Sequence, residues 1–358
     1  MLRTAFAPGL RTVSAAAVVL LATASVARAD APFDARAYLD EAIAVVRTKA
    51  LFADRVDWSR LSAELHRKGD GAATAFDTYP LLVDLLRALD DRHSFLQLSA
   101  ARAEAYTAAK GQAFVYPPDP AASPRRTLDR RFVGRSGPAP VDDLVDGKRI
   151  RSVVVTGTDS NAPEALQTYA AAMNQALAAG PRACGYIVDL RGNTGGNMAP
   201  MIAGLGVLLG DGPVGGYVGR EGAGGGESWV VRGDRLMLRS GAGEQVLLRV
   251  PGWTALPGAA TAPVAVLIDG GTASSGEITA IAFAGRKRTV RFGAASYGVS
   301  TATSGFALSD GANLVIVDSL VRDRTGRRYP DGVTPDHATD PAAAPAAAKR
   351  WLAERCRR

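Results

Sequence analysis

Apolar side chains recur every three to four positions in two stretches near the start of the chain. Residues 37–50 show this spacing. Residues 79–89 show it most clearly, at Tyr79, Leu82, Leu85, Leu86 and Leu89. Such spacing is typical of amphipathic helices that bury one face. It predicts a small helical N-terminal domain over residues 30–110.

The pattern changes after residue 150, where short apolar strands alternate with helices. Strands are expected at 151–156, 186–190, 264–268 and 289–292, helices at 163–179, 198–209 and 275–284, and a hairpin around Asp310-Gly311 between 306–308 and 313–317. This alternation predicts an α/β fold with a core over residues 151–345. Residues 111–150 are rich in Pro, Gly, Arg and Asp, which predicts a loop or linker, and residues 346–358 are expected to form a C-terminal helix.

The first 29 residues have the features of a secretion signal. Arg3 and Arg11 precede an uncharged stretch over residues 12–27 and give a positively charged start. Ala27-Arg28-Ala29 forms an A-x-A cleavage site. We therefore expect a mature chain that begins at Asp30 in the periplasm or outside the cell, with no stable membrane insertion after cleavage. The alternative is an uncleaved anchor, but the apolar stretch is shorter than the roughly 20 residues that a membrane span needs.

Composition and charge exclude several classes of protein. The chain has 358 residues, of which 47% are hydrophobic and 22% charged, so a disordered or fibrous protein is excluded. Loss of the signal, with its three arginines, lowers the net charge from +7 to +4. The Arg-rich stretch 125–135 has no aromatic platform or nucleic-acid motif beside it, so nucleic-acid binding is not expected.

Cysteine and histidine spacing gives no local metal-ligand pattern, and neither a metal nor a cofactor is predicted. Export would permit a disulfide between Cys184 and Cys356. The apolar strand beside Cys184 favours a buried thiol instead.

Two strand-to-helix junctions carry the candidate chemistry. Residues 189–197 form a Gly-rich turn whose backbone N–H groups could converge on an anion, although a purely structural tight turn is the alternative. Residues 269–277 place Ser274 between an apolar strand and a helix, where its hydroxyl could act as a nucleophile. Ser274 and Glu277 also fit a capping box, so a structural role for the serine stays open.

A serine nucleophile needs a base, and His93 is the best candidate among the histidines. It closes a helical segment, whereas His66 lies on an apparent helix surface and His337 lies in the C-terminal tail. A structural role at the end of the helix is the alternative for His93. Because His93 and Ser274 lie far apart along the chain, the sequence alone does not show that they meet.

Together these segments resemble the tail-specific (C-terminal processing) serine peptidases and their tricorn-core relatives. Residues 189–196 are similar to the D-L-R-x-N-x-G-G segment of that family, and residues 271–277 to its nucleophile turn. Residues 332–336 (G-V-T-P-D) resemble the segment that closes its core, and residues 91–94 the D-x-H-[ST] of its histidine-using branch. The resemblance implies a crotonase/ClpP-like core of ββα units and hydrolysis of peptide bonds in proteins or peptides.

The resemblance also implies roles for individual residues at the junctions. Ser274 would be the nucleophile and His93 the general base. The oxyanion donors would be backbone N–H groups of Gly195, Gly196 and Ser275.

This chain departs from the tail-specific branch at two places. That branch pairs its serine with a lysine, and Val299 occupies the matching position here, so Lys–Ser catalysis is excluded there. No PDZ-like module is recognisable between residues 100 and 150. The acid that would orient His93 stays open between Glu277 and Asp331.

The leading hypothesis is therefore an exported serine peptidase that acts on protein or peptide substrates. A catalytically silent peptide- or ligand-binding protein on the same scaffold is the alternative. Acyl-thioester chemistry of the crotonase kind is a third reading, which export disfavours. The sequence does not indicate the oligomeric state.

Overall fold

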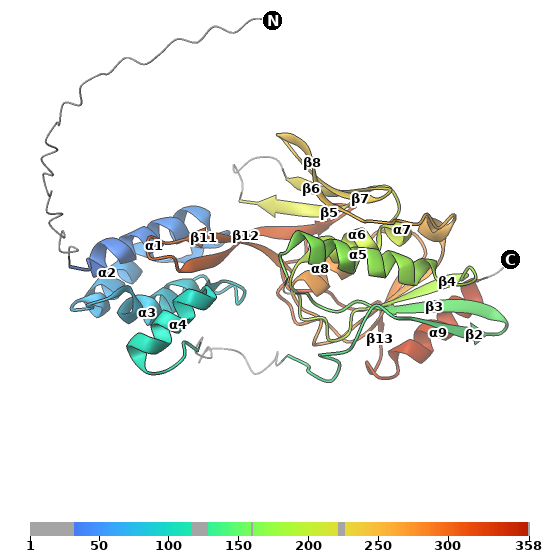
Figure 1. Ribbon diagram of the computed structural model, residues 1–358, viewed down its shortest axis with the longest axis horizontal. Helices are drawn as coiled ribbons and strands as arrows, with labels where there is room; N and C mark the ends of the chain where they lie inside the picture. Colours follow the sequence, from blue (N-terminus) through green and yellow to red (C-terminus); the bar gives the residue numbers. More distant parts are fainter. Residues whose placement is uncertain (1–31, 116–127, 159, 221–225, 357–358) are drawn as a thin grey trace, which may run out of the picture.

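The computed structural model describes residues 32–115, 128–158, 160–220 and 226–356, so the predicted signal peptide lies outside the described residues. Figure 1 shows a helical N-terminal domain beside a larger α/β core, which confirms the predicted fold class. Among the described residues, no helix is both long and apolar enough to cross a bilayer.

The N-terminal domain is built from amphipathic helices whose starts are capped by polar side chains. The helices are α1 (Ala35–Lys49), α2 (Trp58–Gly69), α3 (Ala75–Arg87) and α4 (Ala100–Lys110), with a 3-10 turn at Ala53–Arg55. Asp34, Asp57 and Ser99 each accept a backbone N–H of the first turn that follows. The apolar face of α3 is buried against α1, with Leu39 and Leu82 fully inside. Burial of this face is what holds the helices together.

The core contains a mostly parallel sheet in the order β13–β10–β9–β4–β3–β2. Its strands are β2 (Pro140–Val145), β3 (Lys148–Val154), β4 (Gly185–Asp189), β9 (Val264–Ile268), β10 (Thr289–Gly293) and β13 (His337–Ala338). The helices of the core are α5 (Pro163–Ala178), α6 (Met198–Gly204), α7 (Gly206–Leu209), α8 (Ser275–Ala282) and α9 (Ala344–Arg355), with a 3-10 turn at Ala259–Thr261.

Helices cover both faces of this sheet. Alternate side chains of β9 pack on opposite sides: Val266 joins the cluster with α5, α6 and α8, whereas Leu267 joins the cluster with α9. Burial on both faces explains why β9 is apolar at every position and why β4 is free of charge until its last residue, Asp189.

A second, antiparallel sheet links the core to the N-terminal domain. Its order is β1–β12–β5–β6–β7–β8, and β11 pairs with β12. The strands are β1 (Phe95–Gln97), β5 (Gly212–Gly219), β6 (Glu227–Arg232), β7 (Arg235–Ser240), β8 (Gly243–Arg249), β11 (Thr301–Ala307) and β12 (Asn313–Asp323). The β11–β12 ribbon extends from the core onto the helices (Figure 1). At its tip, the Asp310 carboxylate accepts hydrogen bonds from the Tyr38 and Tyr79 hydroxyls, each at 2.8 Å.

Within the predicted loop or linker over residues 111–150, the structure has strands from Pro140 onward. β2 and the first part of β3 form an antiparallel hairpin, with Asp146 and Gly147 in its turn at φ values of 49° and 71°. Asp and Gly tolerate positive φ, and Asp-Gly between strands is a hairpin signal as well as a loop signal. The segment before this hairpin lies on the core, where the Asp129 amide donates to the Gly270 carbonyl at 3.2 Å.

The C-terminus also differs from the prediction. The last helix, α9, covers Ala344–Arg355 rather than residues 346–358. Cys184, expected to be a buried thiol, forms a disulfide with Cys356. Because α9 packs across the start of β4, its last residues reach Cys184, which the apolar pattern alone did not reveal.

Candidate active site

Ser274 lies in the turn between β9 and α8, in a backbone conformation that is rare for a residue with a side chain. Its φ is 50° and its ψ is −119°. Non-glycine residues in such regions are strained and concentrate at functional sites. Position 195 in the neighbouring turn must be glycine, because a Cβ on Gly195 would lie 2.8 Å from the Cβ of Ser274. The two glycine-rich junctions are therefore packed against each other at the serine.

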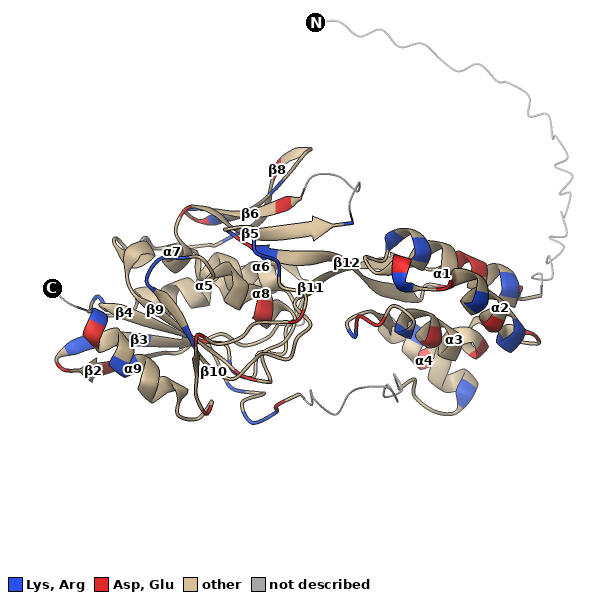
Figure 2. Cartoon of the chain, turned by 180° about the vertical axis from the view of Figure 1, so that it is seen from behind, with Lys and Arg blue, Asp and Glu red and all other residues tan. Residues whose placement is uncertain are grey.

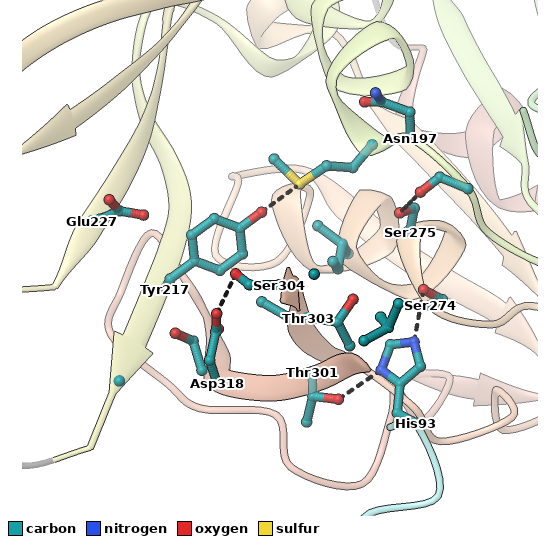
Figure 3. Close-up of a pocket in the computed structure, with 18 of the residues that line it drawn as sticks. His93, Asn197, Tyr217, Glu227, Ser274, Ser275, Thr301, Thr303, Ser304 and Asp318 are labelled. Carbon is teal, nitrogen blue, oxygen red and sulfur yellow. Dashed lines mark hydrogen bonds between the residues drawn. The ribbon is translucent and has the colours of Figure 1, made fainter. Parts of the chain in front are cut away.

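His93 reaches this serine from the N-terminal domain. It lies in the loop between α3 and β1, where the Asp91 carboxylate accepts the backbone N–H groups of His93 and Ser94 at 3.0 and 2.8 Å. The Ser94 hydroxyl in turn accepts the Val317 amide of β12 at 2.9 Å, which fixes the loop to the second sheet. The His93 Nε2 atom lies 3.1 Å from Ser274 Oγ, across 181 residues of sequence (Figure 3).

The other ring nitrogen of His93 contacts a hydroxyl rather than a carboxylate. Nδ1 lies 2.8 Å from Oγ1 of Thr301, the first residue of β11. Burial lowers the pKa of the His93 imidazole to about 4, although the negative charge of Asp91 counteracts this effect. The ring is consequently neutral at physiological pH and can accept a proton.

The structure does not bring Glu277 to His93. The buried Glu277 carboxylate accepts the Ser274 amide at 2.9 Å, so it forms its half of the predicted capping box. It also accepts the Ser296 hydroxyl at 2.5 Å and the amides of Gly298 and Val299 at 2.7 and 2.9 Å. Burial raises the pKa of this carboxyl, and these donors counteract the rise. Glu277 therefore ties the serine turn to the loop before β11.

Neither Asp331 nor Val299 provides the hydrogen-bond partner seen at either nitrogen of the His93 ring. Asp331 is exposed in the loop between β12 and β13, while the two ring nitrogens of His93 meet Ser274 and Thr301. Val299 is buried, and its backbone amide donates to the Glu277 carboxylate. Sequence reasoning missed Thr301, since an isolated threonine 208 residues from the histidine carries no local signal.

The proposed oxyanion donors differ in their hydrogen bonding. The Gly195 amide donates to Asn193 Oδ1 at 3.0 Å, so it is already engaged inside the turn. The Gly196 carbonyl accepts the Ser275 hydroxyl at 2.5 Å, which joins the two junctions. Gly196 and Ser275 line the same cavity as Ser274. Their bond to each other joins the Ser275 hydroxyl to the Gly196 carbonyl and does not involve either backbone amide. These two residues are thus better placed than Gly195 to face a substrate carbonyl.

A cavity of about 1180 Å³ opens over the Ser274–His93 pair. Its walls come from the two glycine-rich junctions and from strands of the second sheet, including β11, β12 and β5. Glu227 and Asp318 are its acidic residues, and none of the described lining residues is Lys or Arg. On the N-terminal helices, by contrast, both signs of charge are interspersed (Figure 2).

Potential metal ligands do not gather in this cavity. Within the part of the chain that the structure describes, no three His, Cys, Asp or Glu side chains lie close enough together to hold a metal ion. The chemistry that the arrangement itself supports is acyl transfer, because a serine hydroxyl lies within hydrogen-bond distance of a neutral imidazole beside a cavity.

Comparisons with known proteins locate this arrangement in a family. The model of peptidase family S41 matches residues 151–339, which is more than half of the chain. Nisin-resistance protein of Lactococcus lactis subsp. lactis is 36% identical over 169 residues, which cover 47% of this chain and 49% of that protein. Carboxyl-terminal-processing peptidase 2, chloroplastic, of Arabidopsis thaliana is 30% identical over 155 residues, covering 42% of this chain and 25% of that protein. The matches therefore span about half or less of these relatives.

Solved structures share the fold over most of the chain. A lipoprotein from Streptococcus agalactiae matches with a TM-score of 0.65 at 20% identity, covering 91% of this chain and 98% of that one. The photosystem II D1 C-terminal processing protease matches with a TM-score of 0.52 at 16% identity, covering 90% and 97%. These likenesses include the N-terminal helical region as well as the core. The family match and the α/β fold lead to one conclusion: the chain belongs to peptidase family S41.

Proposed function

We propose that this protein is an exported serine peptidase that hydrolyses peptide bonds in proteins or peptides, with Ser274 as nucleophile and His93 as general base. The observation that carries the proposal is the 3.1 Å contact between Ser274 Oγ and His93 Nε2. It joins residues from two domains at the strained turn of a peptidase core. The hydrogen-bond distance and the neutral imidazole are what a general base needs.

The reaction follows from this geometry. The Ser274 oxygen attacks the carbonyl carbon of the scissile bond while its proton passes to His93 Nε2. The resulting oxyanion would be stabilised by the backbone N–H groups of Gly196 and Ser275. The imidazolium then returns the proton to the leaving amine, which leaves an acyl-enzyme on Ser274. Water, deprotonated by the same histidine, hydrolyses this ester and regenerates the serine.

Export and a peptide substrate have separate support. The sequence of the first 29 residues has the features of a cleaved signal, and the Cys184–Cys356 disulfide fits an oxidising compartment such as the periplasm. The cavity of about 1180 Å³ over the Ser274–His93 pair has room for a peptide segment. One relative is named for resistance to nisin, a peptide, and this association supports a peptide ligand for this chain, either cleaved or only bound.

One observation favours a second candidate function, a silent peptide-binding protein. The Nδ1 atom of His93 meets Thr301 rather than a carboxylate, and a pKa lowered to about 4 makes the imidazole a weak base. The cleft would then bind peptides without cleaving them.

Labelling of the mature protein with a fluorophosphonate separates these functions. The peptidase proposal predicts covalent labelling that disappears in Ser274→Ala and falls by at least about a thousandfold in rate in His93→Ala, since the nucleophile loses its base. Ser304→Ala is the matched control, because it removes another hydroxyl that lines the same cavity. This variant should be labelled, and should cleave peptides, like the parent. Absence of labelling between pH 5 and pH 9, in a folded protein, would instead support the silent binding protein.

A further inference from the structure

His93 has an unusual partner at its second nitrogen. A histidine that acts as base for a serine must keep its proton on the far nitrogen, and a carboxylate usually holds it there. Here the far nitrogen, Nδ1, faces the Thr301 hydroxyl at 2.8 Å (Figure 3). Thr301 is 4% exposed, so bulk water does not compete for this contact.

We propose that Thr301 is the positioning residue of the Ser274–His93 pair, with its hydroxyl in the place that a carboxylate takes in a Ser-His-acid triad. This proposal rests on the proposed peptidase function, and it deepens that function by naming the group that orients the base. Thr301 touches no reacting atom and acts through His93.

The position of Thr301 is fixed from two directions. It pairs with Leu320 of β12 at the start of β11. The residue before it, Ser300, donates its hydroxyl to the Tyr329 carbonyl at 2.7 Å and accepts the Gly332 amide at 2.8 Å. Both ends of this short stretch are therefore held by backbone pairing and by buried hydrogen bonds.

The same loop is coupled to the nucleophile through Glu277. One oxygen of its carboxylate accepts both the Ser274 amide and the Val299 amide, each at 2.9 Å. A single buried group thus sets the spacing between the serine turn and the loop that presents Thr301. Glu277, expected from the sequence as a candidate acid for the histidine, supports both of the histidine's partners instead.

A hydroxyl constrains the histidine differently from a carboxylate. Threonine can donate or accept, so the neutral ring is free to adopt either tautomer toward it. Once the ring takes the serine proton, both nitrogens are donors, and Nδ1–H can only donate to the Thr301 oxygen. Thr301 therefore matters most in the charged state that forms during catalysis, and no proton passes to it.

The charged groups around the ring belong to two elements, the loop that carries His93 and helix α8. Asp91 lies on the same loop and favours the imidazolium, and the Arg92 guanidinium reaches the Gly298 carbonyl at 3.4 Å. The Glu277 carboxylate lies behind the serine on α8, where its bonds to donors other than the histidine disperse its charge.

The test compares Thr301→Val, which keeps the shape of the side chain and removes the hydroxyl, with Thr301→Ser, which keeps the hydroxyl. We expect Thr301→Val to lower kcat by about ten- to a hundredfold with KM unchanged, because a buried N–H loses its acceptor. Thr301→Ser should stay within about threefold of the parent. Circular dichroism and thermal unfolding report whether each variant is folded.

The pH profile distinguishes positioning from a general loosening of the site. In the parent, kcat/KM should fall only as the pH approaches about 4, where His93 becomes protonated. Loss of the Thr301 acceptor disfavours the imidazolium, so the acid limb of Thr301→Val moves to lower pH. A site that had merely opened to water would move this limb toward pH ~6.5, the ordinary pKa of histidine.

A second readout does not need activity. Nitrogen NMR of the imidazoles is tractable because the chain has three histidines, and His93→Gln assigns the signal by difference. In Ser274→Ala, the proposal expects the His93 Nδ1 signal to change on adding Thr301→Val and to persist on adding Thr301→Ser. Unchanged kcat, acid limb and Nδ1 signal in Thr301→Val would overturn the role of Thr301. A parent that neither labels nor cleaves, with the Nδ1 signal responding as expected, would overturn the peptidase function and leave the Thr301 contact standing.

Discussion

The two sides of the candidate site are built in opposite ways. The serine side lies inside the core, where two glycine-rich turns touch through backbone atoms: a Cβ on Gly195 would lie 3.2 Å from the Ala273 carbonyl. The histidine side depends on the N-terminal domain, which holds its loop through side chains such as Asp91 and Ser94. The core therefore supplies the nucleophile by itself, whereas the base is present only when the helical domain is docked.

The two constructions also differ in how they respond to change. Backbone contacts in the core leave no room for added atoms, since packed interiors relax only slightly. The docking of the helices combines apolar packing against Leu308, Leu314 and Ile316 of the β11–β12 ribbon with hydrogen bonds and an ion pair at the ribbon tip. The polar contacts at the tip can be lost one at a time. We expect changes on the serine side to be severe and changes on the histidine side to be graded.

The largest effect is expected from Gly196→Ala on the serine side. The Gly196 φ is 105°, and a Cβ there would lie 1.9 Å from the Thr158 carbonyl oxygen. Relief of this clash must move the turn that carries a proposed oxyanion donor. We expect a loss of about 3 kcal/mol or more in the free energy of unfolding and of at least a hundredfold in kcat/KM.

Gly241→Ala is the matched control for this substitution. Gly241 lines the same cavity, but its added Cβ would meet nothing within 4 Å and its φ is not in the left-handed region. Denaturant unfolding and peptide hydrolysis should give values near those of the parent. Equal stability for Gly196→Ala and Gly241→Ala would contradict the rigid construction of the serine side.

A smaller effect is expected from Asp310→Asn at the ribbon tip. The Asp310 carboxylate accepts the hydroxyls of Tyr38 and Tyr79 and forms an ion pair with Arg102. The amide cannot accept from all of these donors, so we expect docking to weaken by about 1–3 kcal/mol. His93 follows the helix that carries Tyr79, and fluorophosphonate labelling should slow several-fold as the docked fraction falls.

Hydrogen exchange gives the structural counterpart of this experiment. Faster exchange in Asp310→Asn should be confined to the N-terminal helices and the ribbon, while the parallel sheet keeps its protection. Asp70→Asn, an exposed position at the end of α2, should change neither labelling nor exchange. Uniform loss of protection across both domains would show that the domains unfold as one unit and that the histidine side does not loosen separately.

The serine side is also the part of the molecule that the sequence predicted best. The turns at residues 189–197 and 269–277 are recognisable from the sequence, because glycines, a capping box and apolar strands occur within a few positions of one another. The α/β fold was predicted for the same reason, since strand and helix periods are local. The family match covers this core, residues 151–339, and does not include His93.

The histidine side escaped prediction wherever contacts are long-range. Thr301 is separated from His93 by 208 residues, and no local pattern marks it as a partner. The strands β5–β8 were not predicted, because β5 reads G-P-V-G-G-Y-V-G, and its glycines suppress the alternation that marks a strand. Cross-strand packing decides such segments: Gly215 lies under the ring of Trp229, where a Cβ would be 2.7 Å from it.

The smallest expected effect concerns substrate charge, which the sheet beside His93 should control. Asp318 on β12 and Glu227 on β6 face the cavity, and Figure 3 shows them on the Tyr217 side of it. Burial raises the pKa of the Tyr217 hydroxyl, and the negative charges of Glu227 and Asp318 raise it further.

Because the described lining residues of the cavity include two carboxylates and neither Lys nor Arg, the cavity should favour peptides that carry Lys over otherwise identical peptides that carry Glu. Exposed ion pairs contribute at most about 1 kcal/mol, so Asp318→Asn should reduce the Lys-to-Glu ratio of kcat/KM by up to about fivefold, and less at high salt. A neutral peptide should be cleaved as before, since the serine side is untouched. Asp146→Asn, on the β2–β3 turn and outside the cavity lining, should leave the ratio unchanged. An unchanged ratio in the double variant Asp318→Asn/Glu227→Gln would mean that substrate side chains do not contact these two carboxylates. The second sheet would then contribute only Thr301, the partner of His93, to the site.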